Sequence, residues 1–231
     1  MIKFSLSKAI RFMAKGENEK AEKCFLKAIG SNDITSLVNY GYFLTRKGES
    51  GKAVLLFEER IIPVFDKKKK QKSDEEILIY TNYGLSLSVN KDLTKAIEIT
   101  EKLMEKYQTT LLFGNLGYFY ILSGNIDKAK SVTLKGYDFS PEDVTIIDNL
   151  ARIYFLEENY VEAEKYYNKL MEKKPSYPDA YNMYAEFLIK TGKEKEAIPV
   201  LEKCLSFNFT AFTLADRENT QKLYEKISKG E

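Results

Sequence analysis

Small residues recur along this chain at a nearly constant interval. Six alanines open similar apolar stretches, at Ala21, Ala53, Ala96, Ala129, Ala163 and Ala197. Their successive spacings are 32, 43, 33, 34 and 34 residues. Twelve residues before each alanine stands another small residue, at Ala9, Gly41, Gly84, Gly117, Ala151 and Ala185. A period of this length is typical of solenoids and other repeat arrays, so the repetition constrains the fold more than any single element does.

Each repeat is predicted to contain two helices. Apolar residues recur at three- and four-residue spacings on both sides of a short turn. Turn glycines precede four of the alanines by five residues, at Gly16, Gly48, Gly124 and Gly192, and Asn90 and Asn159 serve the other two turns. The small residues let two helices approach closely where their backbones cross. One helix pair cannot bury its apolar face alone, so the pairs should stack on one another.

The pattern predicts one continuous domain of six helical hairpins. Their expected ranges are 2–33, 34–65, 77–109, 110–143, 144–177 and 178–211. The one long interval places an inserted charged loop at 66–76. Residues 212–231 lack the small residues of the repeat, and we expect them to form a polar-backed C-terminal capping helix.

Several helix ends have their own signals. Ser140 is expected to cap a helix whose first residue is Pro141. Ser73 begins "SDEE", which predicts a capping box. Pro63 is expected to end or kink the second helix of its hairpin. Pro199 predicts a kink or a delayed start in the last hairpin.

The repeat resembles the tetratricopeptide repeat (TPR) family. The best copy, "DNLARIYFLEENYVEAEKYYNKLMEKKP", supplies the motif residues Leu150, Ala151, Tyr154, Ala163, Tyr167 and Pro175. Six copies cover roughly residues 2 to 211. The departures are the absence of Trp, and Thr100 and Thr133 at positions expected to be large and apolar. The resemblance implies an all-α fold, a right-handed α-solenoid of stacked antiparallel helix pairs (a TPR superhelix) with a C-terminal capping helix.

Composition argues against several classes of function. The chain has no histidine, which removes His-based triads, the common zinc sites and the usual general base near neutral pH. No Gly-rich phosphate loop is present. We therefore expect no enzymatic activity, no cofactor and no metal. The net charge is only +2, which disfavours a nucleic-acid partner.

The sequence indicates the cellular location less strongly than it indicates the fold. Cys24 and Cys204 lie inside apolar helical patterns and are expected to be buried reduced thiols. No apolar stretch is long enough to span a membrane. Lys8 and Arg11 interrupt the region where a signal peptide would be apolar. The expectation is a soluble cytoplasmic protein, with a mature secreted form that has lost its leader as the alternative.

A ladder of asparagines is the main candidate site. The heptads "VNYGYFL", "TNYGLSL", "GNLGYFY" and "DNLARIY" each carry Asn two residues before the small residue. By the TPR resemblance, this position points into the concave groove. The ladder consists of Asn39, Asn82, Asn115 and Asn149, with Asn182 displaced by one position in the last repeat. A primary amide donates and accepts, so it can pair with an extended peptide backbone. Satisfying neighbouring helices is the other use that stays open.

Neighbouring positions would add specificity to that groove. The residue after each small residue should face the same way, and Phe155 lies one turn further on. The predicted partner-binding residues besides the asparagines are Tyr42, Tyr118, Arg152, Phe155 and Glu186. Chaperone-binding TPR proteins place a clamp Lys three residues before the small residue. This chain has no Lys there, which argues against binding a heat-shock-protein tail.

The main functional prediction is a non-enzymatic scaffold or adaptor that binds an extended peptide or partner segment in its concave groove. Three alternatives stay open. An RNA-binding helical repeat is supported by "KKKKQK" at Lys67, although "SDEE" follows it and no aromatic residues interleave. Self-assembly through exposed solenoid ends would give a homo-oligomer. Regulation by a small peptide pheromone, as in some bacterial TPR regulators, is the third.

Overall fold

A computed structural model describes residues 2–68 and 70–229, and the elements in these ranges are helices without any strand. The predicted all-α fold is therefore confirmed for this part of the chain. The residues group into two compact units, one running to Tyr107 and including Thr210–Phe212, the other containing Gln108–Phe209 and the chain from Thr213 onward. Each unit is compact by itself, and a single continuous domain stays a prediction.

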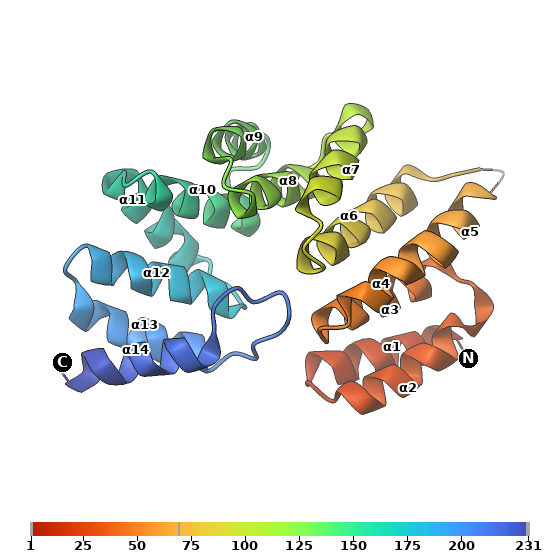
Figure 1. The fold of residues 1–231 in the computed structure, drawn as a ribbon, viewed down its shortest axis with the longest axis horizontal. Coiled ribbons are helices and arrows are strands. Elements are labelled where there is room, and N and C mark those ends of the chain that lie inside the picture. Colours follow the sequence, from red (N-terminus) through yellow and green to blue (C-terminus); the bar gives the residue numbers. More distant parts are fainter. Residues whose placement is uncertain (1, 69, 230–231) are drawn as a thin grey trace. The chain divides into compact units, whose positions relative to one another are not determined.

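The first unit consists of three helical hairpins (Figure 1). Its elements are α1 (Ile2–Ala14), α2 (Asn18–Ala28), the short 3-10 helix η1 (Ile29–Ser31), α3 (Ile34–Arg46), α4 (Ser50–Leu56), the π-helical turn η2 (Phe57–Ile61), α5 (Ile62–Asp66), α6 (Ser73–Val89) and α7 (Leu93–Lys106). Contacts join α1 to α2, α3 to α4 and α6 to α7. Each hairpin falls within, or close to, one of the intervals expected from the repeat.

The second unit contains the other three hairpins and the C-terminal helix. Its elements are α8 (Thr110–Leu122), α9 (Ile126–Phe139), α10 (Val144–Leu156), α11 (Tyr160–Glu172), α12 (Pro178–Lys190), α13 (Glu194–Leu205) and α14 (Arg217–Lys229). Successive first helices touch, α8 with α10 and α10 with α12. Helix α14 packs against α13, the position that a capping helix would take.

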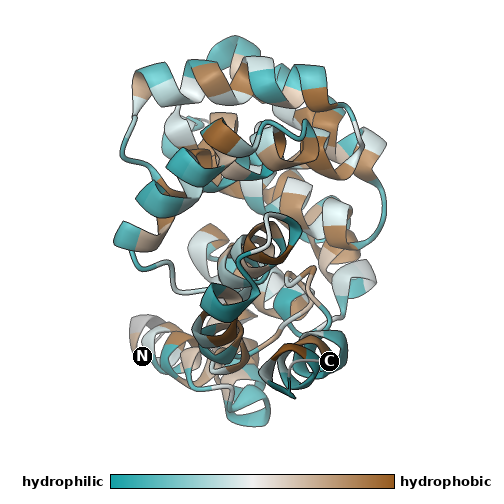
Figure 2. Cartoon of the chain, turned by 90° about the vertical axis from the view of Figure 1, so that its left-hand side faces the viewer, coloured by the Kyte–Doolittle hydropathy of each residue, from teal (hydrophilic) through white to brown (hydrophobic). Residues whose placement is uncertain are grey.

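The small residues of the repeat lie where helices meet. A Cβ atom added to Gly41 would come 2.7 Å from the ring of Phe57. At Gly117 the added atom would collide with the hydroxyl of Thr133 and contact the amide of Asn149. Ala129 is fully buried. In Figure 2, apolar and polar residues alternate around individual helices, as the three- and four-residue spacing predicts.

Two predicted helix starts are wrong. Helix α10 begins at Val144, and its N-cap is Asp143, whose carboxylate accepts hydrogen bonds from the backbone N–H groups of Thr145 and Ile146. The Ser140–Pro141 pair lies outside the helix because Asp143, three residues after Ser140, offers a cap in which one carboxylate oxygen accepts from two backbone N–H groups. Ser73 is the first residue of α6 rather than its cap, and the capping box does not form. The Glu76 carboxylate instead binds Lys106 and Tyr107.

The prolines are accommodated inside helices. Pro63 follows the π-helical turn η2 and stands in the first turn of α5, which continues to Asp66. The backbone is helical without a break from η2 into α5, so the π-type turn directly before Pro63 is where this helix accommodates a residue that has no N–H to donate. Pro199 lies within α13, which begins at Glu194, so the start of this helix is not delayed. The kink, the other expected outcome, stays a prediction. Because α6 begins at Ser73, the charged insertion is shorter than expected.

Candidate functional site

The first two ladder asparagines, both in the first unit, bind their own helices. The amide nitrogen of Asn39 donates to the carbonyl of Thr35, and that of Asn82 donates to the carbonyl of Leu78, each at 2.8 Å. Both side chains keep part of their surface in solvent. Each amide therefore folds back along its helix instead of extending away from it.

Asn149 has a structural role in the second unit. It is 2% exposed, and its amide nitrogen donates to the backbone carbonyl of Gly114 at 2.8 Å. Gly114 lies on α8 and Asn149 on α10, so this hydrogen bond joins the first helices of two successive hairpins. A buried amide with its donor used in this way connects helices, which is the second of the two uses that the sequence leaves open.

Asn182 is likewise engaged within the second unit. It is 8% exposed, its amide nitrogen donates to Glu186 Oε1 at 2.6 Å, and its oxygen accepts from the hydroxyl of Thr220 at 3.0 Å. Thr220 belongs to the C-terminal helix α14. The sequence gives no sign of this residue's role, because the chain after residue 211 leaves the repeat pattern.

Asn115 differs from the other four asparagines. It is 9% exposed, and its amide nitrogen has no hydrogen-bond acceptor among the described residues. The side chain lines a cavity of about 370 Å³ between the N-terminal ends of α8 and α10. That cavity is otherwise lined by Thr109, Thr110, Leu111, Asp143 and Thr145. An unused buried donor beside an open cavity is suited to bind an acceptor brought by another molecule.

Two of the predicted aromatic residues, Tyr42 and Phe155, pack against other rings of the protein. The ring of Tyr42 stacks on that of Phe212 within the first unit, with centroids 5.1 Å apart. Phe155 packs among Tyr160, Tyr167 and Phe187 of the second unit, with centroids 6.0 to 6.4 Å apart. These contacts place both side chains in aromatic clusters of the protein itself.

Arg152 is the most unusual of the predicted site residues. It projects from α10 and is only 8% exposed, yet no ion pair or hydrogen bond joins its guanidinium to any described residue. Its Nε atom is fully buried without an acceptor. The guanidinium lies over the ring of Tyr118, 5.9 Å from the ring centroid. Desolvation raises the pKa of Tyr118 to about 12, so the tyrosine remains neutral at physiological pH.

A buried carboxyl group lies one helical turn before Arg152. Asp148 accepts a hydrogen bond from the hydroxyl of Tyr177 at 2.9 Å on Oδ2, while its Oδ1 has no partner among the described residues. Desolvation raises the pKa of Asp148 to about 6, although the nearby Arg152 charge and the Tyr177 hydrogen bond oppose the rise. Burial also raises the pKa of Tyr177.

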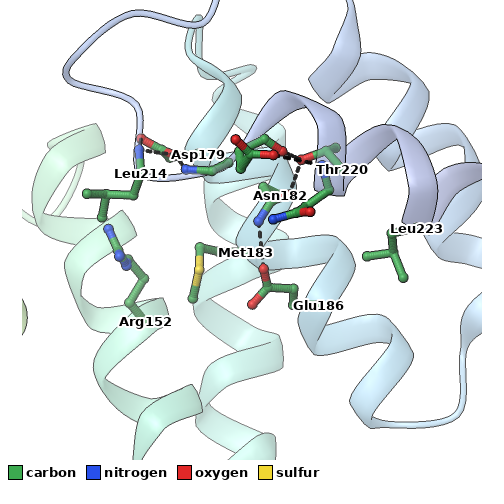
Figure 3. Close-up of a pocket in the computed structure, with 11 residues that line it drawn as sticks. Arg152, Asp179, Asn182, Met183, Glu186, Leu214, Thr220 and Leu223 are labelled. Carbon is green, nitrogen blue, oxygen red and sulfur yellow. Dashed lines mark hydrogen bonds between the residues drawn. The ribbon is translucent and has the colours of Figure 1, made fainter. Parts of the chain in front are cut away.

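Arg152 lines a second cavity, of about 290 Å³, with residues of α12 and the C-terminal segment (Figure 3). Figure 3 shows its guanidinium directed toward Leu214 and beside Met183. Asn182 and Glu186 line the same cavity, so three predicted site residues meet there. Glu186 is an exposed residue, but its carboxyl lies close enough to protein atoms for desolvation to raise its pKa.

Asp179 holds the wall of this cavity in place. Its carboxylate accepts hydrogen bonds from the backbone N–H groups of Leu214 and Ala215 at 2.9 to 3.2 Å. Asp216 then caps α14 by accepting from the N–H of Asn219 at 2.8 Å. Sequence reasoning missed Asp179 and the segment Thr213–Asp216, because neither belongs to the repeated motif.

The described part of the chain carries neither a metal-binding cluster nor a helix able to span a membrane. Among the described residues, no group of His, Cys, Asp and Glu side chains is arranged to hold a metal ion. None of the described helices combines the length and the apolar character needed to cross a membrane. Cys24 and Cys204 are both free, and Cys204 is buried.

Comparison with known proteins supports the repeat assignment. Residues 140–207 match the family model described as "Tetratricopeptide repeat". This range contains the helices α10 to α13 and the whole of the best sequence copy of the motif. The predicted resemblance is therefore confirmed, and residues 140–207 are similar to tetratricopeptide repeats; that the chain contains six stays a prediction. No curated protein matches the chain.

Solved structures share the fold at low sequence identity. A tetratricopeptide repeat protein from Parabacteroides merdae is 20% identical, with a TM-score of 0.63 over 99% of this chain and 86% of its own. A thermophilic TPR protein from Thermus thermophilus is 15% identical, with a TM-score of 0.67 over 85% and 100%. A chain of the APC/C hetero-tetramer Cut9-Hcn1 is 14% identical, with a TM-score of 0.70 over 96% of this chain and 42% of that one. These likenesses confirm the helical-repeat fold.

Proposed function

We propose that this protein is a non-enzymatic, cytoplasmic scaffold or adaptor that binds an extended segment of another protein. The binding surface is the first-helix face of the second unit, which we define as Asn115 and Tyr118 of α8, Arg152 of α10, and Asn182 and Glu186 of α12. TPR-type helical repeats generally serve protein interaction. The neighbour Cut9-Hcn1 is itself described as a hetero-tetramer.

The observation that supports this proposal is a pair of buried donors without acceptors. Asn115 Nδ2 and Arg152 Nε have no hydrogen-bond partner among the described residues, and each side chain lines a cavity on a first helix. A buried donor left unpaired costs about 1–3 kcal/mol. A partner segment that supplies carbonyl or carboxylate oxygens would recover that cost, whereas a purely structural role would leave it uncompensated.

The magnitudes require more than the asparagines. A net hydrogen bond contributes about 0.5–1.5 kcal/mol, and association costs roughly 4–15 kcal/mol in lost freedom of motion. Three of the five ladder amides already donate to carbonyl groups of the protein, and Asn182 donates to Glu186. Affinity must therefore come from Asn115, Arg152 and apolar contacts in the cavities, and we expect micromolar binding, near −8 kcal/mol.

The experiment compares protein capture by two matched variants. Tagged wild-type protein, an Asn115→Ala/Arg152→Met double variant and an Asn39→Ala/Asn82→Ala double variant are used as baits in lysate of the native cell. The second double variant is the control for the asparagine, because it removes amides from two positions where they bind their own helices. A partner retained by wild type and by the Asn39/Asn82 variant, but lost from the Asn115/Arg152 variant, is the expected result.

Circular dichroism of each bait must first show an unchanged helical spectrum. Asn149 is left intact because its hydrogen bond to Gly114 joins two helices, and its loss would disturb the packing of the surface being tested. Equal capture by all three baits would remove the first-helix face of the second unit from the proposal. Retention of a partner only by baits with intact Asn39 and Asn82 would move the site to the first unit.

A further inference from the structure

We infer that the cavity beside Arg152 is a recognition pocket for a carboxylate, which gives the proposed partner segment an acidic group at this position. The inference rests on the proposed function only in assigning that carboxylate to a partner protein. The pocket itself is argued from Arg152, its neighbours and the space in front of it.

Arg152 supplies a permanent charge and one buried donor, Nε, that has no acceptor among the described residues. A guanidinium carries five N–H donors in a planar fork and stays protonated in proteins. The side chain is more than nine-tenths buried, and its Nε is inaccessible and unpaired among the described residues. The planar fork matches the two oxygens of a carboxylate, which can accept from it in a bidentate arrangement. A neutral carbonyl would satisfy a donor but would leave the buried charge uncompensated.

Three acidic residues near Arg152 form hydrogen bonds with other groups of the protein. The Asp179 carboxylate accepts from two backbone N–H groups, and Asp216 caps α14. Asp148 binds Tyr177 and does not line the cavity. Each of these carboxylates lies beyond 4.0 Å from the guanidinium nitrogens, because none forms an ion pair with Arg152. Asp148 and Glu186 interact with the Arg152 charge only from beyond ion-pair distance. Buried charges in proteins are ordinarily paired directly, so Arg152 favours an external anion.

Glu186 is the neighbour that opposes an anionic ligand. It lines the cavity, and one of its oxygens accepts from Asn182. A second carboxylate in the same cavity would be repelled by Glu186, which limits affinity and makes this residue a specificity determinant. Removing the Glu186 charge should therefore strengthen carboxylate binding, whereas removing the Arg152 charge should weaken it.

The cavity has the size and lining for one side chain. Its volume of about 290 Å³ is at the lower end for small-ligand sites. Met183, Leu214 and Leu223 supply apolar lining for a short methylene stem. An acidic side chain on a peptide would place its stem against these groups and its carboxylate on Arg152.

The test uses the full chain and three small probes. N-acetyl-glutamate methylamide carries a side-chain carboxylate, N-acetyl-alanine carries a terminal carboxylate, and N-acetyl-glutamine methylamide is the neutral match of the first. Binding is followed by NMR at the Nε–H of Arg152, one of five arginines in the chain, and at the labelled methyl group of Met183. The Arg152→Lys variant assigns the arginine signal.

We expect the glutamate probe to move both signals and the glutamine probe to move neither. The Arg152→Gln variant should weaken the glutamate probe roughly tenfold or more at Met183, and Glu186→Gln should tighten it about threefold. A stronger response to N-acetyl-alanine supports the same carboxylate pocket and assigns the group to a chain terminus. Equal responses to the glutamate and glutamine probes, or no response to any probe, would overturn the inference.

Failure here is distinguishable from failure of the proposed function. The probes report on the pocket alone, without any partner protein. Suppose that no probe moves the NMR signals but the Asn115/Arg152 variant loses its partner. The carboxylate pocket would then be rejected, and the proposed interaction surface would be kept. If the glutamate probe moves the NMR signals but the Asn115/Arg152 variant still captures the partner, the interaction surface would be rejected and the carboxylate pocket kept.

Discussion

At the scale of single residues, hydrogen bonding separates asparagines that the sequence makes alike. Asn115 and Asn149 both precede a small residue by two positions, yet only Asn149 reaches a carbonyl of the neighbouring helix. The ladder positions could be predicted from the repeat. Their different uses could not, because each depends on which atoms the adjacent hairpin brings within about 3 Å. The burial of Arg152 could not be predicted either, because it also depends on neighbouring elements.

The buried carboxyl of Asp148 predicts a pH-dependent stability. Its folded pKa of about 6 lies above its ordinary value of 3.8, mainly through desolvation. The folded state therefore holds the proton more tightly, and this group's contribution to the free energy of unfolding is full below about pH 4 and is lost as the pH rises through about 6. The shift corresponds to about 3 kcal/mol.

We expect the non-titrating Asp148→Asn variant to gain up to about 3 kcal/mol relative to wild type when the pH is raised from about 4 to about 7. Urea unfolding of both proteins at the two pH values measures this gain. An Asn side chain can still accept from Tyr177, so the hydrogen bond is retained as a control. A difference between the two proteins that does not change with pH would contradict the prediction.

A substitution at Gly117 tests whether α8 and α9 approach each other closely. A methyl group there would collide with the Thr133 hydroxyl and contact the Asn149 amide. Gly117→Ala should therefore lower the free energy of unfolding by about 1–3 kcal/mol, seen as a lower urea midpoint. Adding Thr133→Ala should recover part of the loss. Gly51→Ala is the control, because its nearest atom, Asn90 Oδ1, would lie at an ordinary 3.6 Å.

At the scale of elements, the repeat pattern predicted helices better than helix ends. Turn glycines and paired small residues depend on local backbone geometry, which recurs in every copy. The start of α10 instead depends on competition between two candidate caps, and Asp143 prevails because its carboxylate accepts two N–H groups. The segment Thr213–Asp216 was not predictable, since its position depends on hydrogen bonds to Asp179 on another element.

Ala129 tests the same crossing of α8 and α9 from the other helix. It is fully buried in α9. Ala129→Leu should overpack the crossing and cost about 1–3 kcal/mol, measured by urea unfolding. Ala14→Leu is the matched control, because Ala14 is exposed near the end of α1. An unchanged midpoint for the Ala129 variant would show that this position is not a crossing.

A substitution at Asp179 tests whether its carboxylate holds the segment Thr213–Asp216 against α12. Replacing it with Ala removes the acceptor for the Leu214 and Ala215 N–H groups. We expect these two amides to exchange hydrogen with solvent roughly tenfold faster or more, while the helical spectrum stays the same. Hydrogen exchange followed by NMR measures the effect. Asp179→Asn, which keeps one acceptor oxygen, should give an intermediate rate, and full protection in the Ala variant would contradict the assignment.

At the scale of the whole molecule, the two compact units predict two unfolding events. Gly41→Ala crowds the ring of Phe57 in the first unit, and Ala129→Leu crowds the second. If each unit unfolds cooperatively by itself, each variant should lower one transition in a calorimetric scan and leave the other in place. A single transition lowered by both variants would instead support the one continuous domain that the repeat pattern predicts.

The hydrogen bond between Thr220 and Asn182 has a consequence for engineering the length of this array. Asn182 is the last ladder residue, and α14 supplies the hydroxyl that its oxygen accepts from. A chimera that grafts an additional hairpin in place of α14 must bring an equivalent donor to that oxygen. Grafts lacking one would leave a buried amide oxygen unsatisfied at the junction, and the extended array should begin to fray there.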